Sequence, residues 1–179
     1  MKKFRKGFTL LELLVVIGVM GLMSSMAMIA GQQATDAARA NNIADGLEKA
    51  ASAMMMYYGD NADVIAMEGI GDSTTIKEAD LVKGASAYLK KTGSTGEDDM
   101  LVTEASAAAG KYAVALQGTA PAQEWWVVYT IPATDIAGVG PILKNKANRM
   151  GLKTTKAGTT DYDGETATVA MKVRGKTSS

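Results

Sequence analysis

The feature that most constrains this chain is an apolar run close to its N-terminus. Residues 8–31 read FTLLELLVVIGVMGLMSSMAMIAG, and Glu12 is the one charged side chain in the run. A helix over residues 8–30 would be roughly 35 Å long, which exceeds the roughly 30 Å thickness of a bilayer's hydrocarbon core. The run therefore predicts a membrane-spanning helix.

Basic residues precede the run and predict its orientation. Residues 1–7 contain four of them, Lys2, Lys3, Arg5 and Lys6. Such charges hold their end of a span in the cytoplasm, so the rest of the chain is expected outside the membrane. A secretory signal peptide is disfavoured because its apolar region is typically only about 7–15 residues long. On hydropathy alone, a plain membrane anchor is an equal alternative.

Glu12 favours a functional segment over an inert membrane anchor. An acidic residue at the centre of a membrane span costs roughly 2.5–3.5 kcal/mol, and less near the interface. An inert anchor has no use for such a group, so Glu12 predicts a function that requires a partner. A suitable partner is the new α-amino group that would form if the chain were cut just before Phe8.

The sequence GFTLLE at residues 7–12, after a short basic leader, resembles the type IV prepilin motif. The resemblance implies that a prepilin peptidase cleaves after Gly7 and methylates the new amino group of Phe8. It also implies that Glu12 neutralises the Phe8 amine of a neighbouring subunit during assembly. Thr9 fits the family pattern. Both charged groups are costly to leave unpaired in lipid, so this contact would favour one axial register between subunits.

The helical pattern continues beyond the membrane run. Apolar residues recur every three or four positions as far as residue 58, which predicts one helix over residues 8–58, about 77 Å long. Gly18 and Gly21 each weaken it by about 1 kcal/mol relative to Ala. Ile29 lies where family members often have proline, so any local melting is expected at Gly18 and Gly21. Residues 54–56, three methionines, are expected in a packed core.

The remaining residues predict an α+β head. A capping box formed by Thr75 and Glu78 begins a short helix, and residues 136–150 form another, which Pro141 should interrupt or restart. Strands are expected at residues 100–105, 111–117, 124–131 and 166–174. The expected architecture is an antiparallel sheet laid on the long helix, with inserted helices. Trp125 and Trp126 should point to opposite faces, one into the core and the other to a subunit contact or to solvent for adhesion.

These patterns divide the chain into four segments. Residues 1–7 are a removable leader, residues 8–30 the transmembrane and filament-core half of the long helix, residues 31–58 its amphipathic half, and residues 59–179 the head. The inserted helix resembles type IVb pilins, whereas the short leader and the first mature residue, Phe8, resemble type IVa. The cysteine pair of most members is absent, so pairing of strand 166–174 within the sheet must hold the final segment.

Composition removes several kinds of chemistry. The chain has no cysteine and no histidine, so it lacks thiolate catalysis, disulfides, the commonest general base and the commonest metal ligand. The acidic runs at residues 60–72 and 97–99 lack the ordered spacing of a calcium loop. A net charge of zero gives no basic excess for nucleic acid. We expect no catalytic activity, no cofactor and no metal.

The predicted function is that of a major pilin, a structural subunit of a type IV pilus. Its expected partners are further copies of itself in a helical homopolymer, the bacterial inner membrane before assembly, the prepilin peptidase and the pilus assembly machinery. The assembled filament would be extracellular. A type II secretion pseudopilin or a minor pilin remains an alternative, as does a membrane-tethered periplasmic binding module, which would need neither cleavage at Gly7 nor Glu12.

Overall fold

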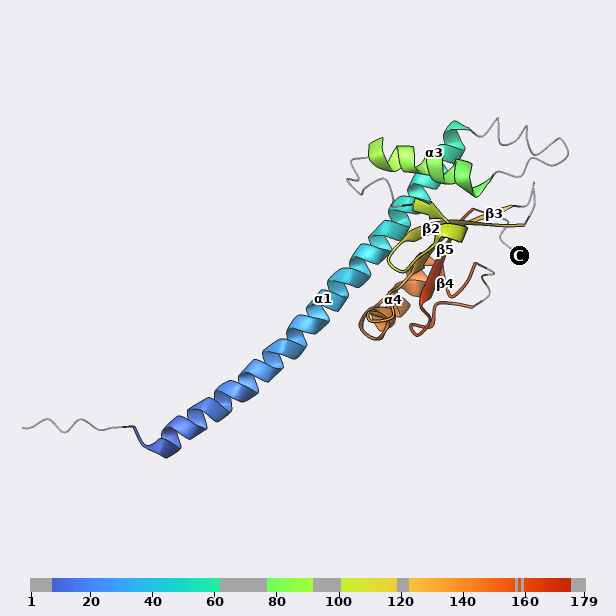
Figure 1. The fold of residues 1–179 in the computed structure, drawn as a ribbon. Helices are drawn as coiled ribbons and strands as arrows, with labels where there is room; N and C mark the ends of the chain where they lie inside the picture. Colours follow the sequence, from blue (N-terminus) through green and yellow to red (C-terminus); the bar gives the residue numbers. More distant parts are fainter. Residues whose placement is uncertain are drawn as a thin grey trace, which may run out of the picture. The chain divides into compact units, whose positions relative to one another are not determined.

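The computed structural model describes residues 8–61, 77–91, 101–118, 123–156, 158 and 160–174. Its elements are α1 (Leu10–Asp60), α3 (Glu78–Lys91), β1 (Leu101–Thr103), η1 (Glu104–Ser106), β2 (Tyr112–Gln117), β3 (Glu124–Thr130), α4 (Ile136–Met150), β4 (Leu152–Lys153) and β5 (Thr168–Arg174) (Figure 1). The predicted α+β class and the long N-terminal helix are confirmed. The chain divides into two compact units, one ending at Asp36 and one beginning at Ala37.

The second unit contains a five-stranded sheet in the order β1-β2-β3-β5-β4. Neighbouring strands are antiparallel except β1 and β2, which are parallel. The prediction of a purely antiparallel sheet is therefore wrong at this edge. Between β1 and β2 the chain forms η1 and then turns at Gly110, whose φ of +84° lies in the left-handed region. This return brings Tyr112 beside Leu101, so that β2 runs in the same direction as β1.

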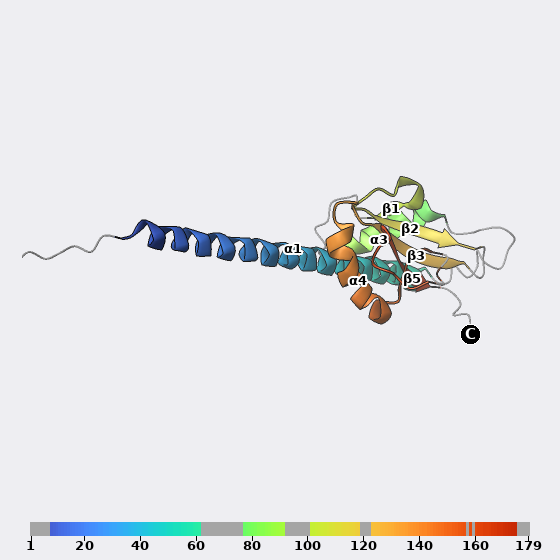
Figure 2. The same ribbon diagram turned by 90° about the horizontal axis from the view of Figure 1, so that it is seen from below.

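The second half of α1 lies alongside the sheet in both ribbon views (Figures 1 and 2). The main core is formed by buried side chains of these two elements together with α3 and α4. Alternate residues of β3 face this core, which contains Trp125, Val127 and Tyr129. The Trp125 ring meets Tyr58 of α1 edge to face, with ring centroids 5.6 Å apart. Such contacts fix the half of α1 that belongs to the second unit against the sheet.

The opposite face of the sheet has a smaller core of its own. Trp126 lies there with Ala115, Val128 and Ala170, and is only 2% exposed. The prediction that one tryptophan would be exposed or at a subunit contact is therefore wrong, although the two do lie on opposite faces. Gly158 closes over Trp126, because a Cβ on this glycine would lie 2.5 Å from the indole ring.

The C-terminal strand is held by pairing on both sides. β5 pairs with β3 along its length and with β4 at Ala170 and Met171. The expectation that this strand is fixed within the sheet is confirmed. β4 was not predicted, because two residues are too few to show alternation of apolar and polar side chains.

Helix α4 runs continuously through Pro141, which corrects the prediction of an interruption. Proline there removes one backbone hydrogen bond of the helix. Packing on both sides of it compensates, since Val139 and Leu143 are fully buried. Gly140 allows the close approach, because a Cβ at that position would lie 2.0 Å from the carbonyl oxygen of Gly164.

Glu78 connects α3 to the sheet. Its carboxylate accepts hydrogen bonds from the backbone N–H groups of Glu104, at 3.2 Å, and of Leu116, at 3.4 Å. The predicted capping box needs Thr75, which lies outside the described residues. The observed role of Glu78 is to satisfy two backbone donors at the ends of β1 and β2, elements far from it in the sequence.

Candidate functional site

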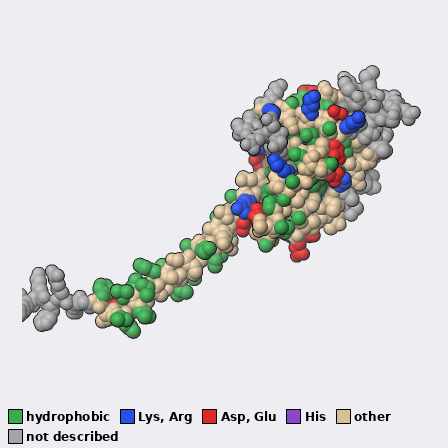
Figure 3. Space-filling model, in the orientation of Figure 1, with side chains coloured by type: hydrophobic (Ala, Val, Ile, Leu, Met, Phe, Trp, Pro, Cys, Tyr) green, Lys and Arg blue, Asp and Glu red, His purple; other side chains and the backbone are tan. Residues whose placement is uncertain are grey.

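The first unit presents an apolar helix surface without cover. Its large hydrophobic side chains, from Phe8 to Ile29, are 45–85% exposed. Figure 3 shows these hydrophobic side chains along the first half of α1, whereas Lys, Arg, Asp and Glu side chains gather on the second unit. By length and composition α1 qualifies as a helix that can cross a membrane. Such a surface requires lipid or another protein chain around it.

Thr9 and Glu12 form a capping box at the start of α1. The backbone N–H and the hydroxyl of Thr9 both donate to Oε2 of Glu12, each at 2.9 Å, and the Glu12 N–H donates to the Thr9 hydroxyl at 3.3 Å. The spacing of three residues is what this reciprocal arrangement requires. The helix start thereby satisfies backbone donors that would otherwise lack a partner in an apolar environment.

This arrangement bears directly on the predicted role of Glu12. Both Thr9 donors use Oε2, so the capping box itself does not engage Oε1. Phe8, immediately before the box, is 81% exposed. Gly7 lies outside the described residues. The structure therefore brings Thr9 and Glu12 together and leaves Phe8 accessible beside them.

Sequence reasoning missed the capping box, although its signal was present. A Thr followed three residues later by Glu, directly before an apolar run, is the standard pattern of a helix start. Thr9 thus has a definite structural task. Gly18 and Gly21, by contrast, lie inside α1, and a Cβ on either would meet nothing within 4 Å. Melting at these glycines remains a prediction.

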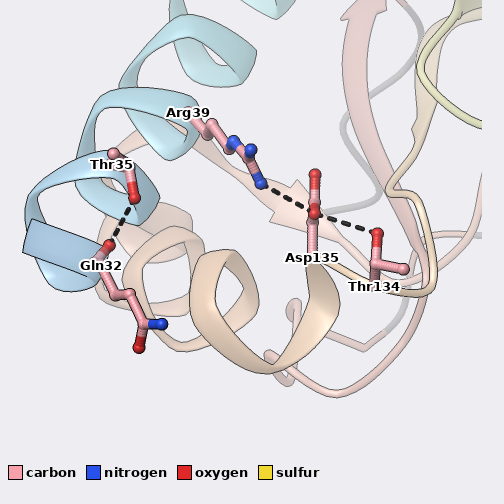
Figure 4. Close-up of polar contacts among 5 residues, drawn as sticks. All are labelled: Gln32, Thr35, Arg39, Thr134 and Asp135. Atoms are coloured by element: carbon pink, nitrogen blue, oxygen red, sulfur yellow. Dashed lines mark hydrogen bonds and ion pairs between the residues drawn. The ribbon is translucent and has the colours of Figure 1, made fainter. Parts of the chain in front are cut away.

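In the second unit, polar contacts join α1 to α4. Nη1 of Arg39 lies 2.9 Å from Oδ1 of Asp135, the residue before α4, and this oxygen also accepts a bond from the Thr134 hydroxyl at 3.1 Å (Figure 4). Farther along, Lys146 of α4 donates to the side chain of Asn41. These exposed contacts contribute at most about 1 kcal/mol each to stability. Within the first unit, the Thr35 hydroxyl donates to the Gln32 carbonyl oxygen of α1 at 2.7 Å, as Figure 4 also shows.

Metal-ligating side chains do not cluster in the part of the chain that the structure describes, where no group of three is found. Most of the acidic residues weighed as calcium ligands, at residues 63–72 and 97–99, lie outside that part.

Comparisons with known proteins connect the start of the chain to a described family. Residues 2–28 match the model of the prokaryotic N-terminal methylation motif. The chain is also 31% identical over 80 residues to a fimbrial protein of Neisseria meningitidis serogroup A, serotype 4A. That alignment covers 43% of this chain and 47% of the relative, so the chain spans about half the length of the curated relative that it matches. No solved structure matches the chain significantly.

Proposed function

We propose that this chain, which belongs to the type IV pilin family, is a major structural subunit that polymerises into a surface filament. The observation that carries the proposal is an exposed apolar helix with one acid, Glu12, in its first turn. A prepilin peptidase would remove residues 1–7 and methylate the amine of Phe8. The precursor would lie in the bacterial inner membrane until the pilus assembly machinery withdraws it into the growing filament.

The proposed assembly step is an ionic contact between subunits. The Phe8 amine of an incoming subunit would meet Glu12 of a neighbour already in the filament. The capping box supports this, because it fixes the Glu12 carboxylate and occupies only Oε2. Pairing a cation with this carboxylate removes the cost of two unpaired charges in an apolar environment, and a subunit at the wrong axial position would not gain that benefit.

Processing and assembly can be tested together by mass spectrometry of filaments sheared from the cell surface. The expected species begins at Phe8 and carries one additional methyl group. A chain that still begins at Met1, or its absence from the filaments, would overturn the proposal. The membrane-tethered binding module predicts the uncleaved chain.

The role of Glu12 needs a substitution with a matched control. Glu12→Ala should insert into the membrane and be cleaved, yet give far fewer filaments. Glu165→Ala removes an exposed acid of the second unit and should leave the filament yield unchanged. Equal yields from the two variants would refute the assigned role of Glu12.

The major-pilin reading is preferred to a pseudopilin on the similarity to a fimbrial protein. A pseudopilin head commonly holds calcium, so thermal unfolding with calcium and with a chelator separates the two. The proposal expects equal melting temperatures. A head stabilised by calcium would favour the pseudopilin.

A further inference from the structure

An open apolar groove lies between α1 and β5 in the second unit. Its volume is about 630 Å³, and its lining residues are Glu48, Ala51, Ser52, Met55, Met56, Met171, Lys172 and Val173. Met55 and Met56 are 46% and 49% exposed. In the described part of this unit they are the large hydrophobic residues that remain exposed, so the expectation that all three methionines of residues 54–56 are core holds only for Met54.

The groove lies where the sheet is incomplete. β4 pairs with β5 only at Ala170 and Met171, so Lys172 and Val173 extend beyond it. The ammonium group of Lys172 is 2.6 Å from Glu124 and 5.7 Å from the centre of the Trp126 ring, which belongs to the opposite face of the sheet. The ammonium group of Lys172 therefore lies toward the opposite face of the sheet. Glu48, on the α1 side of the groove, is the other charged residue of its lining.

We propose that this groove receives the apolar segment, residues 8–30, of a second copy of the chain. The inference rests on the proposed function, since it concerns contacts inside the filament. The segment and the groove have matching chemistry. Residues 13–30 of the segment carry no charged side chain, so none of them would place a like charge beside Glu48. Its large side chains are exposed in the subunit and need cover once the helix has left the lipid.

The properties of the two surfaces also indicate how they meet. Methionine is flexible and polarisable, so Met55 and Met56 can adapt to the contour of a partner helix. Gly18, Gly21 and Ser25 share one face of the apolar segment, three to four residues apart, and nothing lies within 4 Å of a Cβ placed on either glycine. Small residues allow close helix approach, so this face is assigned to the two methionines. Met23 lies on the opposite face.

The absence of cysteine makes the contact measurable by disulfide crosslinking. Two chains, one with Met55→Cys and one with Ser25→Cys, are co-expressed, and intact filaments are oxidised. The expected product is a dimer whose crosslinked peptides contain both substituted positions. The matched control replaces Ser25→Cys by Met23→Cys, which should crosslink at least several-fold less. Equal crosslinking from the two faces, or none from Ser25→Cys in normal filaments, would overturn the proposal.

A second experiment asks whether assembly needs the groove. The full-length double variant Met55→Glu with Met56→Glu should keep the wild-type melting temperature, because both side chains are already half exposed. It should still be inserted and cleaved, but its filament yield should fall at least about ten-fold. Lys49→Glu places a carboxylate on the same helix outside the groove and should assemble normally. Normal yield from the double variant would refute the docking, whereas uncleaved or unassembled wild-type chain would refute the proposed function itself.

Discussion

Gly46 gives the sharpest test of how the second unit is packed. It lies inside α1 directly beneath Tyr112, and a Cβ on Gly46 would be 2.0 Å from the phenolic oxygen and 2.3 Å from the ring carbon that bears it. Ordinary contact begins at 3.4 Å, so the ring would have to withdraw by about 1.4 Å, the difference between the two distances. The hydroxyl would then lose the carbonyl oxygens of Asn42 and Ile43, now at 3.3 and 3.4 Å.

The expected effect of Gly46→Ala is a balance between helix propensity and packing. Alanine favours the helix by about 1 kcal/mol relative to glycine. Overpacking costs about 1–3 kcal/mol, and the weakened hydroxyl contacts add about 1 kcal/mol. The tilted contact of Tyr112 with Tyr129, whose ring centroids are 4.7 Å apart, would also be disturbed. We expect a net loss of roughly 1–3 kcal/mol, measured by urea unfolding of the full chain in detergent micelles.

Two further variants isolate the cause. Gly59→Ala lies in the same helix where a Cβ would meet nothing within 4 Å, so it should be neutral or stabilising by up to about 1 kcal/mol. In a Tyr112→Ala background, Gly46→Ala should become stabilising because the ring is gone. If Gly46→Ala destabilises both backgrounds equally, the steric explanation is wrong.

Three other predictions follow from the contacts and pKa shifts described. Glu78→Ala should lower the free energy of unfolding by about 1–2 kcal/mol, because it leaves two backbone donors without a partner. The control Asp80→Ala should change this free energy by less than about 0.5 kcal/mol, and equal effects of the two variants would contradict the role of Glu78. Thr9→Val should destabilise the start of α1 by about 1 kcal/mol, because it removes the hydroxyl of the capping box. Amide hydrogen exchange at residues 10–13 should become faster while the melting temperature of the head stays unchanged, and unchanged exchange would refute the capping box. Burial raises the pKa of Tyr162 to about 12 and raises the pKa of Tyr129, so the folded state favours their neutral forms. Their contribution to stability is complete below the ordinary tyrosine pKa of about 10 and is lost as the pH rises through the folded values; urea midpoints that stay constant to about pH 12 would contradict this.

Much of the fold could be predicted because its signals are long or strongly periodic. α1 combines an apolar run with an amphipathic stripe, and β2, β3 and β5 have clear strand patterns. The errors arise where tertiary contacts outweigh local preference. Pro141 is retained inside α4 because residues on both sides of it are buried. Trp126 is buried because a distant segment containing Gly158 covers the second face of the sheet, and no local pattern indicates that cover.

The two candidate surfaces differ in predictability for the same physical reason. The hydrogen bonds of Thr9 and Glu12 depend only on a spacing of three residues, so they were available from the sequence. The groove at Met55 and Met56 exists because β5, more than a hundred residues later, lies beside α1 with part of one edge uncovered by β4. Helical periodicity places these methionines near a core but cannot say that the core ends before them. A surface made by distant segments therefore has to be found in the structure, and crosslinking from Met55→Cys addresses a contact that no motif would have indicated.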